Sequence, residues 1–588
     1  MLGGRACTST CVRPHWVDTW QSYGIYPSAT VHLWLQEGLN DDAFVSTNHT
    51  MLRVTGTMKL IQTALAAAVS SLLMTTAHAA TPDSFPAPTT NRDTWFQAGQ
   101  QTVIDNGKLV KDNRQAKNVI LFVGDGMGIS TITAARILQG QQPNIIGTGA
   151  DKKASSGEEN SLSFEKFPYL AHSKTYSANQ QTPDSAPTMT AMVTGVKTND
   201  GALSVDQDTT RGDCNMDPHV HSLKTILEVA EQRGKTTGLV STARITHATP
   251  AANYAHTTER DWESDADIKT VGCGTPDIAR QLIEMPYGDG IEVAFGGGRD
   301  RFLPATVTDP EDAGKTGKRL DGRNLTTEWT TKFGANSAFV YDQAGFDKID
   351  PASATHVLGL FERSHMEYEA DRSSDTGKEP SLAEMTEKAI KILQKNDKGF
   401  YLHVEGGRVD HGHHAGNAYR ALTDAIALSD AVQKAVDTLK ALNKLDETLI
   451  VVSADHSHTF TIGGYPQRGN NILGKVIEPG KTTPTLASDK NPYTTLSYAN
   501  GFGYAVNVKG DDIYATPNVP HSGRVESMIS VDTTDPNFHQ EATVPLTSET
   551  HGGEDVAIFA MGPKAHLFQG TVEQNVIYHV MMNALRLK

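Results

Sequence analysis

Three segments combine acidic and imidazole side chains at spacings that suit a metal ion. Asp410 and His414 lie four residues apart, and Asp455 and His456 are adjacent after a run of apolar residues. His551 lies in a polar turn that precedes another apolar run. Zinc binds imidazole nitrogen and carboxylate oxygen readily. Taken alone, Asp410 and His414 are also explained as a solvated loop or a pH-sensitive surface patch. Asp455 and His456 are also explained as a strand-end cap with an exposed histidine, and His551 as a lone histidine. Because unpaired charge at three strand ends is costly, their coincidence favours a shared metal site.

Ser185 is the candidate nucleophile, since the sequence of residues 182–191 is typical of a loop that opens a helix. Free amides and the helix dipole at a helix N-terminus favour an alkoxide or a bound phosphate. A plain N-cap is the alternative. A serine hydroxyl is a weak nucleophile without a base or a metal, and this segment has no Gly-x-Ser-x-Gly elbow. We therefore expect a metal to activate Ser185.

A candidate phosphate-binding side chain follows a short apolar run at residues 237–240. His247 and Arg260 come after this run. The planar guanidinium fork of Arg260 suits two oxygens of a phosphate group, whereas an ordinary surface ion pair is the alternative.

Short apolar runs alternate with helical patterns along most of the chain. Strands are predicted at residues 118–123, 237–240, 292–295, 400–404, 448–453 and 556–560, and helices at 381–394 and 416–442. This alternation predicts an α/β fold with a doubly wound, mostly parallel central sheet and helices on both faces. Ligands of such sheets bind at the carboxyl ends of the strands, where Asp125, Glu405, Asp410, Asp455 and His456 occur.

The composition is that of a soluble globular protein with an acidic balance. The 588 residues are 38% hydrophobic and carry a formal net charge of -16. A negative net charge gives no sign of the positively charged surface that binds nucleic acid, so we expect no nucleic-acid binding. A phosphorylated substrate would need positive charge concentrated locally, by metals or by a few basic side chains.

The N-terminal region is typical of an exported protein. Met58-Lys59 begins a short basic start, residues 60–74 are apolar, and Ala77-His78-Ala79 is a cleavage signal, so residues 58–79 are predicted to be a signal peptide. We expect no structural element in the first eighty residues, and residues 1–57 to be an upstream extension, with translation starting at Met58 or Met51. A genuine extension with an internal anchor is the alternative. Because the apolar run is too short to span a bilayer, we expect a periplasmic or secreted protein without a membrane anchor.

Two cysteines remain after the predicted cleavage. Cys214 and Cys273 are expected to pair, as cysteines of exported proteins usually do, and two buried free thiols are the alternative. The bridge would close a loop of 273 − 214 = 59 residues, which stabilises the fold by about 4 kcal/mol in the chain-entropy model.

These motifs together resemble those of the alkaline phosphatases, from about Trp95 to the C-terminus. The segments that carry the resemblance occur in the family's order: Gly124-Asp-Gly-Met-Gly128, Pro183-Asp-Ser185, His247-Ala-Thr-Pro250, Val404-Glu-Gly-Gly-Arg-Val-Asp-His-Gly-His-His414, Ala454-Asp-His-Ser-His458 and Glu549-Thr-His551. The resemblance implies hydrolysis of phosphate monoesters through a phosphoserine on Ser185, with two zinc ions and one magnesium ion.

The resemblance also implies a role for each site residue. It assigns the first zinc to Asp410, His414 and His551, the second to Asp125, Asp455 and His456, and magnesium to Asp125, Thr249 and Glu405. Arg260 would bind the non-bridging phosphate oxygens. His247 and His411 would contact substrate or water, and histidine at both positions resembles the animal-type branch.

Further features of that branch concern the periphery of the chain. Residues 459–548 resemble its crown subdomain and would form an insertion, with a strand-like piece near 503–508, between the core at 80–458 and its C-terminal part at 549–588. A calcium site would fall on Glu311, the Phe361 carbonyl, Glu362 and Glu379, where Glu379 replaces an aspartate. Cys214 and Cys273 match a disulfide of the branch. The crown and the helix around Trp95 would pack across a homodimer.

Three rival functions are compatible with parts of this pattern. A sulfatase needs an arginine where Met189 lies in Ser185-Ala-Pro-Thr-Met189, which counts against it. A phosphodiesterase of the same superfamily would more often use threonine as nucleophile. A metal-dependent phosphate-binding protein without turnover is the rival from another class.

Overall fold

The computed structural model describes residues 43–47, 50–54, 83–86, 90–143, 154–502 and 528–587. The chain divides into two units, 1–80 and 81–588. In the first unit, β1 (Ala43–Thr47) pairs with β2 (Thr50–Val54) in an antiparallel hairpin. The expectation of no element in the first eighty residues was therefore wrong: both strands are rich in apolar and β-branched residues, which favour strands, and two residues suffice to connect them. The predicted signal peptide lies outside the described residues.

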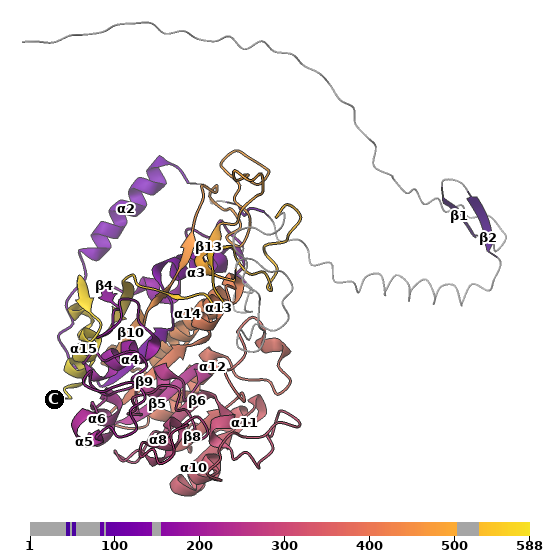
Figure 1. Ribbon diagram of the computed structural model, residues 1–588. Coiled ribbons are helices and arrows are strands. Elements are labelled where there is room, and N and C mark those ends of the chain that lie inside the picture. Colours follow the sequence, from indigo (N-terminus) through magenta and orange to yellow (C-terminus); the bar gives the residue numbers. More distant parts are fainter. Residues whose placement is uncertain are drawn as a thin grey trace, which may run out of the picture. The chain divides into compact units, whose positions relative to one another are not determined.

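The second unit is built on a ten-stranded sheet (Figure 1). Its strands are β3 (Asn118–Gly124), β4 (Tyr169–Lys174), β5 (Thr236–Arg244), β6 (Val293–Gly297), β7 (Ser337–Val340), β8 (His356–Leu360), β9 (Phe400–Gly406), β10 (Thr448–Ala454), β16 (Val556–Met561) and β17 (Thr571–Glu573). Their order is β17-β4-β16-β10-β3-β9-β5-β6-β8-β7. All six predicted strands are present, and the predicted fold class is confirmed.

One strand runs against the others. β16 is antiparallel to both its neighbours, β10 and β4, whereas every other adjacent pair of the sheet is parallel. The amino end of β16 therefore lies at the same edge as the carboxyl ends of β3, β9 and β10. For this reason a residue that precedes β16 can meet residues that follow the other three strands.

Helices cover both faces of the sheet. The helices of this unit are α2 (Arg92–Asn106), which buries no residue and does not cover the sheet, and α3 (Ile129–Gln141), α4 (Ser185–Thr194), α5 (Pro218–His221), α6 (Ile226–Gln232), α7 (Ala248–Ala251), α8 (Ile278–Glu284), α9 (Arg299–Phe302), α10 (Leu325–Phe333), α11 (Gln343–Lys348), α12 (Leu382–Leu393), α13 (Arg408–His414), α14 (Ala418–Ala441) and α15 (Val576–Leu585). The two predicted helices are confirmed as α12 and α14.

Two hydrophobic cores hold these layers together, because successive strand side chains point to opposite faces. In β3, Ile120 and Phe122 join the core formed with α3, α12 and α14. Val119, Leu121 and Val123 join the core formed with α4, α6, α8, α10 and α15. A continuous apolar run such as residues 118–123 is thus explained by burial on both sides.

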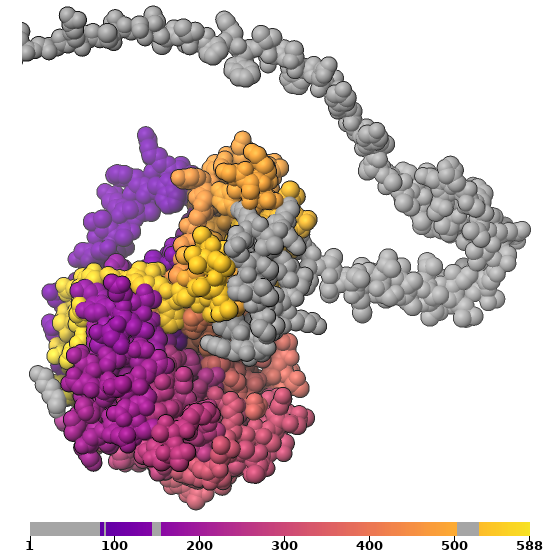
Figure 2. All heavy atoms as spheres, viewed as in Figure 1, coloured from indigo at the N-terminus to yellow at the C-terminus, as the bar shows by residue number. Residues whose placement is uncertain are grey.

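The region between β10 and β16 forms small sheets of its own. β12 (Phe460–Ile462), β13 (Leu496–Gly501) and β14 (Ala542–Pro545) make a three-stranded sheet, and β11 (Ser457–His458) pairs with β15 (His551–Gly552). Figure 2 shows much of this region, in orange to yellow, at one end of the second unit. The strand expected near residues 503–508 lies outside the described residues.

The predicted disulfide is formed between Cys214 and Cys273, which excludes the alternative of two free thiols. Within the described parts of the chain, no helix is both long enough and apolar enough to cross a membrane.

Candidate metal centre

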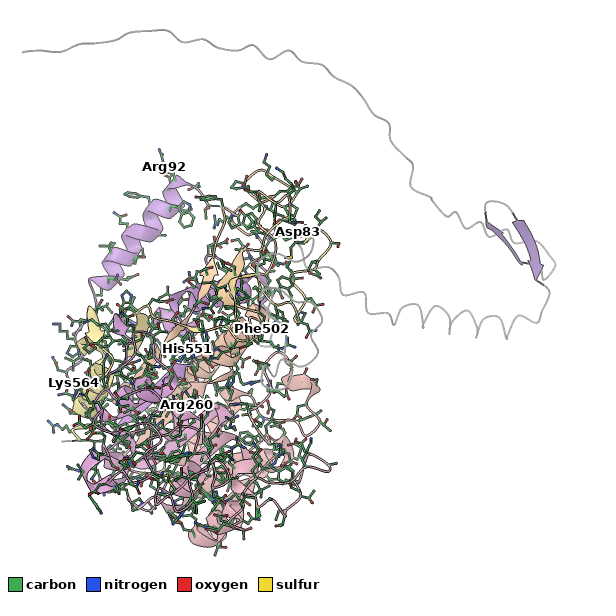
Figure 3. The ribbon with its side chains drawn as sticks, in the orientation of Figure 1. Asp83, Arg92, Arg260, Phe502, His551 and Lys564 are labelled. Carbon is green, nitrogen blue, oxygen red and sulfur yellow. A yellow bond between two sulfur atoms is a disulfide. The ribbon has the colours of Figure 1, made fainter. Side chains whose placement is uncertain are left out.

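Chain segments far apart in the sequence meet at one edge of the sheet. Asp125 follows β3, Glu405 lies in β9, α13 comes directly after β9, Asp455 and His456 follow β10, and His551 precedes β16. Figure 3 marks His551 and Arg260 within the unit. The antiparallel direction of β16 is what brings His551 to this edge, and it could not be read from the local sequence.

The first cluster contains Asp410, His414 and His551. The Nε2 atoms of the two histidines are 3.0 Å apart, and Asp410 Oδ1 lies 3.3 and 3.4 Å from them. Each Nδ1 lies 2.7 Å from a backbone carbonyl, that of Glu549 for His414 and that of Pro183 for His551. Because a carbonyl only accepts, each Nδ1 carries the proton, and two Nε2 lone pairs face each other. A cation between them removes this repulsion, so the residues fit a metal.

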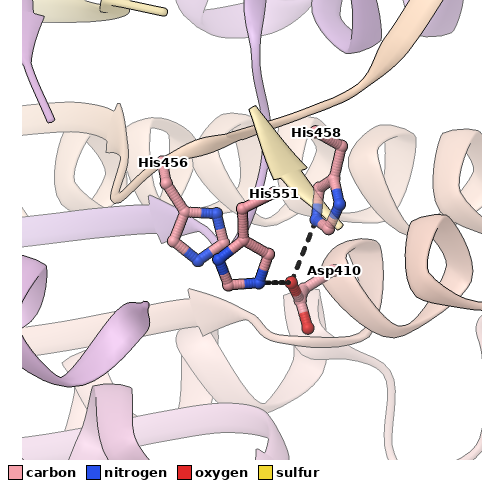
Figure 4. Close-up of side chains that lie close together, drawn as sticks. All are labelled: Asp410, His456, His458 and His551. Carbon is pink, nitrogen blue, oxygen red and sulfur yellow. Dashed lines mark hydrogen bonds and ion pairs between the residues drawn. The ribbon is translucent and has the colours of Figure 1, made fainter. Parts of the chain in front are cut away.

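His458 supports this cluster and was not among the predicted site residues. Its Nε2 lies 2.9 Å from Asp410 Oδ1 (Figure 4). On the other side of the ring, Nδ1 lies 2.6 Å from Glu549 Oε2. Burial alone would lower the pKa of His458, but the two carboxylates raise it to about 10. The imidazolium thereby holds Asp410 in place. The ring also packs on Gly126, where a Cβ would lie 2.2 Å from Nε2.

The second cluster surrounds the hydroxyl of Ser185. His456 Nε2 lies 3.4 Å from Asp125 Oδ1 and 3.2 Å from Asp455 Oδ2. Ser185 Oγ lies 3.2 Å from His456 Nε2 and 3.3 Å from Asp125 Oδ1. All four side chains are buried. Burial and the carboxylate of Asp455 raise the pKa of Asp125 well above its usual range, which indicates a lack of compensating positive charge.

The third group adds oxygen ligands on the far side of Asp125. Thr249 Oγ1 lies 3.4 Å from Asp125 Oδ2, and Ser241 donates to Glu405 Oε2. Glu405 Oε1 is buried without a hydrogen-bond partner among the described residues. Burial raises the pKa of Glu405 to about 7. An all-oxygen set with an unpartnered buried atom fits a hard cation such as magnesium.

Ser185 is the first residue of α4, as expected for a helix N-terminus. The N-cap is Asp184, whose Oδ1 accepts from the Ala186 amide at 3.1 Å. The plain N-cap alternative for Ser185 is therefore excluded, and its hydroxyl is left to face the second cluster. Arg260 Nη1 lies 3.5 Å from Asp184 Oδ2, so the guanidinium is held beside the nucleophile.

His247 and His411 lie beside Arg260, together with a third histidine that the sequence did not single out. His247 Nε2 is 3.0 Å from Arg260 Nη2, and burial and Arg260 lower the pKa of His247 to about 3. The rings of His247 and His411 are 5.5 Å apart, and that of His365 is 4.1 Å from His411. These side chains line one cavity with Ser185, Arg260, Asp410, His414 and His551.

The residues of the expected calcium site form a separate carboxylate cluster. Glu311 Oε1 and Glu379 Oε2 are buried without a hydrogen-bond partner among the described residues, and so is Oδ2 of Asp375, which was not predicted. Burial and the charges of Glu311 and Asp375 raise the pKa of Glu362 to about 8. Phe361, whose carbonyl was the fourth expected ligand, directly follows β8. The unpartnered oxygens fit a calcium ion.

Comparison with known proteins places this architecture in a family. The sequence profile of alkaline phosphatase matches residues 116–587. The chain belongs to the alkaline phosphatase family. The tissue-nonspecific alkaline phosphatase of Felis catus is 44% identical over 498 residues, which cover 83% of this chain and 88% of that protein. The alkaline phosphatase of Gadus morhua is 41% identical over 510 residues, covering 86% and 98%. The predicted resemblance to animal alkaline phosphatases is confirmed.

Solved bacterial alkaline phosphatases share the fold. The enzyme of the Antarctic bacterium TAB5 gives a TM-score of 0.53 at 21% identity, covering 81% of this chain and all of that one. The Thermus thermophilus enzyme gives 0.55 at 22% identity, covering 81% and 93%. As an alkaline phosphatase the chain is a phosphomonoesterase, so the predicted activity is confirmed.

Proposed function

We propose that Ser185 is the nucleophile of this phosphomonoesterase and that it forms a phosphoserine. The proposal rests on the position of Ser185 Oγ, which lies 3.2 Å from His456 Nε2 and 3.3 Å from Asp125 Oδ1. Ser185 and Arg260 line the same cavity. Ser185 Oγ attacks phosphorus, and the bond to the alcohol breaks. Water then attacks the phosphoserine, the bond from phosphorus to Oγ breaks, and inorganic phosphate leaves.

Two zinc ions and one magnesium ion fit the three clusters. The first zinc would be held by Asp410, His414 and His551, the second by Asp125, Asp455 and His456, and magnesium by Asp125, Thr249 and Glu405. Bound divalent ions supply positive charge that activates oxygen nucleophiles and stabilises the departing oxygen. The charges needed for a phosphate substrate are then present locally, in spite of the formal net charge of -16.

Arg260 binds and orients the phosphoryl group in this proposal. Its guanidinium is partly buried beside Ser185 and is held by Asp184 and His247, so two N–H groups can face two non-bridging oxygens. His247 and His411 bound the same cavity and contact the substrate or an ordered water. The preorganised cation lowers the energy of the charge that develops in both steps.

Calcium is the proposed ligand of the carboxylate cluster. The expected ligands are Glu311, the Phe361 carbonyl, Glu362 and Glu379, and the structure adds Asp375 through its unpartnered buried oxygen. The ion would relieve the mutual repulsion of these carboxylates.

A homodimer is the proposed assembly. α2 has no buried residue, and it exposes 56% of Trp95 and 69% of Phe96. Large apolar side chains on an unpacked helix favour burial against a partner, here a second copy of the chain. The disulfide and the predicted signal peptide support a periplasmic or secreted location.

One set of measurements tests the proposed function. The purified protein is expected to release phosphate from a monoester far faster than from a diester, to contain zinc and magnesium, and to lose activity to a chelator. Brief acid quenching with labelled substrate should leave label on Ser185. Phosphate release that a chelator leaves unchanged, or label on another residue, would contradict the proposal.

A further inference from the structure

The cavity above Ser185 is larger than a phosphoryl group requires, and seven carboxylate side chains line it together with the cationic ones. It encloses about 870 Å³ and is lined by seven cationic side chains: Arg244, Arg260, Arg301, Lys318, Arg363, Arg408 and Arg420. A phosphoryl group bound at Ser185 and Arg260 would occupy only the inner end. The rest of the cavity therefore faces the part of the substrate that departs as the alcohol.

Six of these seven cations lie within 4.0 Å of a carboxylate oxygen, and three of the six share Asp300. The pairs are Arg244 with Glu263, Arg260 with Asp184, Arg301 with Asp300, Lys318 with Asp300, Arg363 with Asp300, and Arg420 with Asp371. Among the residues that the structure describes, no carboxylate oxygen lies within 4.0 Å of the Arg408 guanidinium. Of the seven cations, Arg408 is thus the one that forms no ion pair with the described part of the chain.

The contacts of Arg408 hold it in position without a direct ion pair, and its charge acts over a longer distance on the carboxylates of Glu367 and Asp424. Its guanidinium lies 3.7 Å from the centre of the Tyr368 ring, and Nη1 lies 3.2 Å from His411 Nδ1. Nε is buried and has no hydrogen-bond partner among the described residues. Removing a charge from water without pairing it is costly, so an arginine held in this way is suited to an anion that arrives from outside.

Arg408 also lies on the element that carries the first cluster. α13 begins at Arg408 and contains Asp410 and His414, both of which line the cavity. In the proposed function these two residues would hold the first zinc ion, whose positive charge would stabilise the departing oxygen. A group attached to the alcohol would therefore extend along the wall to which Arg408 contributes.

The histidines near Arg408 do not favour a further cation instead. His247, His365 and His411 have ring nitrogens close enough together for a metal. However, Arg260, Arg244 and Arg408 each lie within 2.5 to 3.2 Å of one of these rings. Three guanidinium groups at such distances repel a cation and attract an anion.

We infer that Arg408 is a specificity-determining residue that binds a second anionic group, a carboxylate or a phosphate, on the alcohol part of a phosphate monoester. The inference rests on the proposed function, because it takes Ser185 as the point of attack. It predicts that monoesters of anionic alcohols are processed better than matched neutral ones.

The test compares phenyl phosphate with 3-carboxyphenyl and 4-carboxyphenyl phosphate on the metal-loaded enzyme. For Arg408→Gln, we expect kcat/KM for at least one carboxylated substrate to fall about tenfold or more, mainly through KM, while phenyl phosphate changes less than about twofold. Arg408→Lys should retain an intermediate preference, since it keeps the charge but loses the planar fork. An equal loss on all three substrates would overturn the inference.

Arg363→Gln is the matched control, because Arg363 lines the same cavity but is paired with Asp300 at 3.4 Å. This variant should leave the ratio between carboxylated and neutral substrates unchanged. If Arg363→Gln changed this ratio as much as Arg408→Gln does, the preference would come from the combined electrostatic field of the cavity's charges. That result would overturn the role of Arg408. If the wild-type enzyme hydrolyses none of the substrates, the proposed function itself fails, and this inference fails with it.

Discussion

The sheet-edge centre and the carboxylate cluster concentrate buried charge in different ways. At the sheet edge, imidazoles alternate with carboxylates, and His414 and His458 hold the pKa of the buried Asp410 well below its usual range. In the carboxylate cluster, Glu362 and Glu379 have mainly other carboxylates around them, and their pKa values are raised. Asp410 and His458 therefore attract each other without an ion, whereas the carboxylate cluster depends on an ion for its charged form. Nitrogen ligands suit zinc, and oxygen ligands alone suit calcium.

The largest expected effect is that of Ser185→Ala. This substitution removes the proposed nucleophile from the sheet-edge centre but leaves all of the proposed metal ligands in place. Activity toward a monoester should fall by about 1,000-fold or more, and no phosphoenzyme should form. Steady-state kinetics and acid-quench labelling measure these effects, and metal analysis should show an unchanged zinc content. A labelled phosphoenzyme in this variant would refute the role of Ser185.

His414→Ala should disrupt the first cluster of the sheet-edge centre and leave the carboxylate cluster unchanged. We expect loss of about one zinc per chain and a fall in kcat/KM of about 100-fold or more, because one of three protein ligands is gone. His413→Gln is the control: His413 is the neighbouring residue of α13, but both of its ring nitrogens are hydrogen-bonded, to Thr131 and Tyr498, so it is not a proposed zinc ligand. Equal zinc loss in both variants would argue that α13 folding, and not ligation, is affected.

Arg260→Ala should weaken phosphate binding while the metal content stays the same. The inhibition constant of inorganic phosphate is expected to rise about 10- to 100-fold, as for the loss of charged hydrogen bonds. Competitive inhibition measurements decide this. Arg260→Lys should recover part of the affinity, and a variant that loses zinc would contradict the separation of phosphate binding from metal binding.

Glu362→Gln should have the smallest effect on catalysis and a clear effect on stability. The pKa of Glu362 in the folded protein is about 8, above its unfolded value. Between about pH 4.5 and 8 the unfolded chain releases this proton while the folded chain keeps it, so the calcium-free wild type loses stability as the pH rises. The expected loss is on the order of a few kcal/mol. Urea unfolding at several pH values should show a flatter profile for the variant, and an unchanged slope would contradict the assignment.

Much of the fold could be predicted because buried segments have recognisable local patterns of apolar residues. The strands at residues 118–123 and 448–453 are continuous apolar runs, and the structure places both in the middle of the sheet with all their residues buried. The helix α12 was predicted within one or two residues of its observed bounds, Leu382–Leu393. The hairpin of β1 and β2 was missed, since short strands outside such patterns give a weak signal.

The supporting residues of the site could not be predicted. His458 was noted only as a neighbour of His456, although it is the residue that lies between Asp410 and Glu549. Asp375 and Arg408 belong to no metal-ligand pattern. Their importance comes from a buried atom in each side chain, Oδ2 of Asp375 and Nε of Arg408, that has no hydrogen-bond partner among the described residues. Such properties depend on what surrounds a side chain, which the local sequence does not contain.

The amino-acid sequence by itself determined the chemical groups of this protein: the acid and imidazole pairs, Ser185 before a helix, Arg260, and the two cysteines that pair. Their types and order were sufficient to identify the family. Only the tertiary structure decided which groups meet, because the reversed direction of β16 brings His551 to the edge where β3, β9 and β10 end. Strand direction is set by contacts between segments more than a hundred residues apart, and therefore by the packing of the whole sheet.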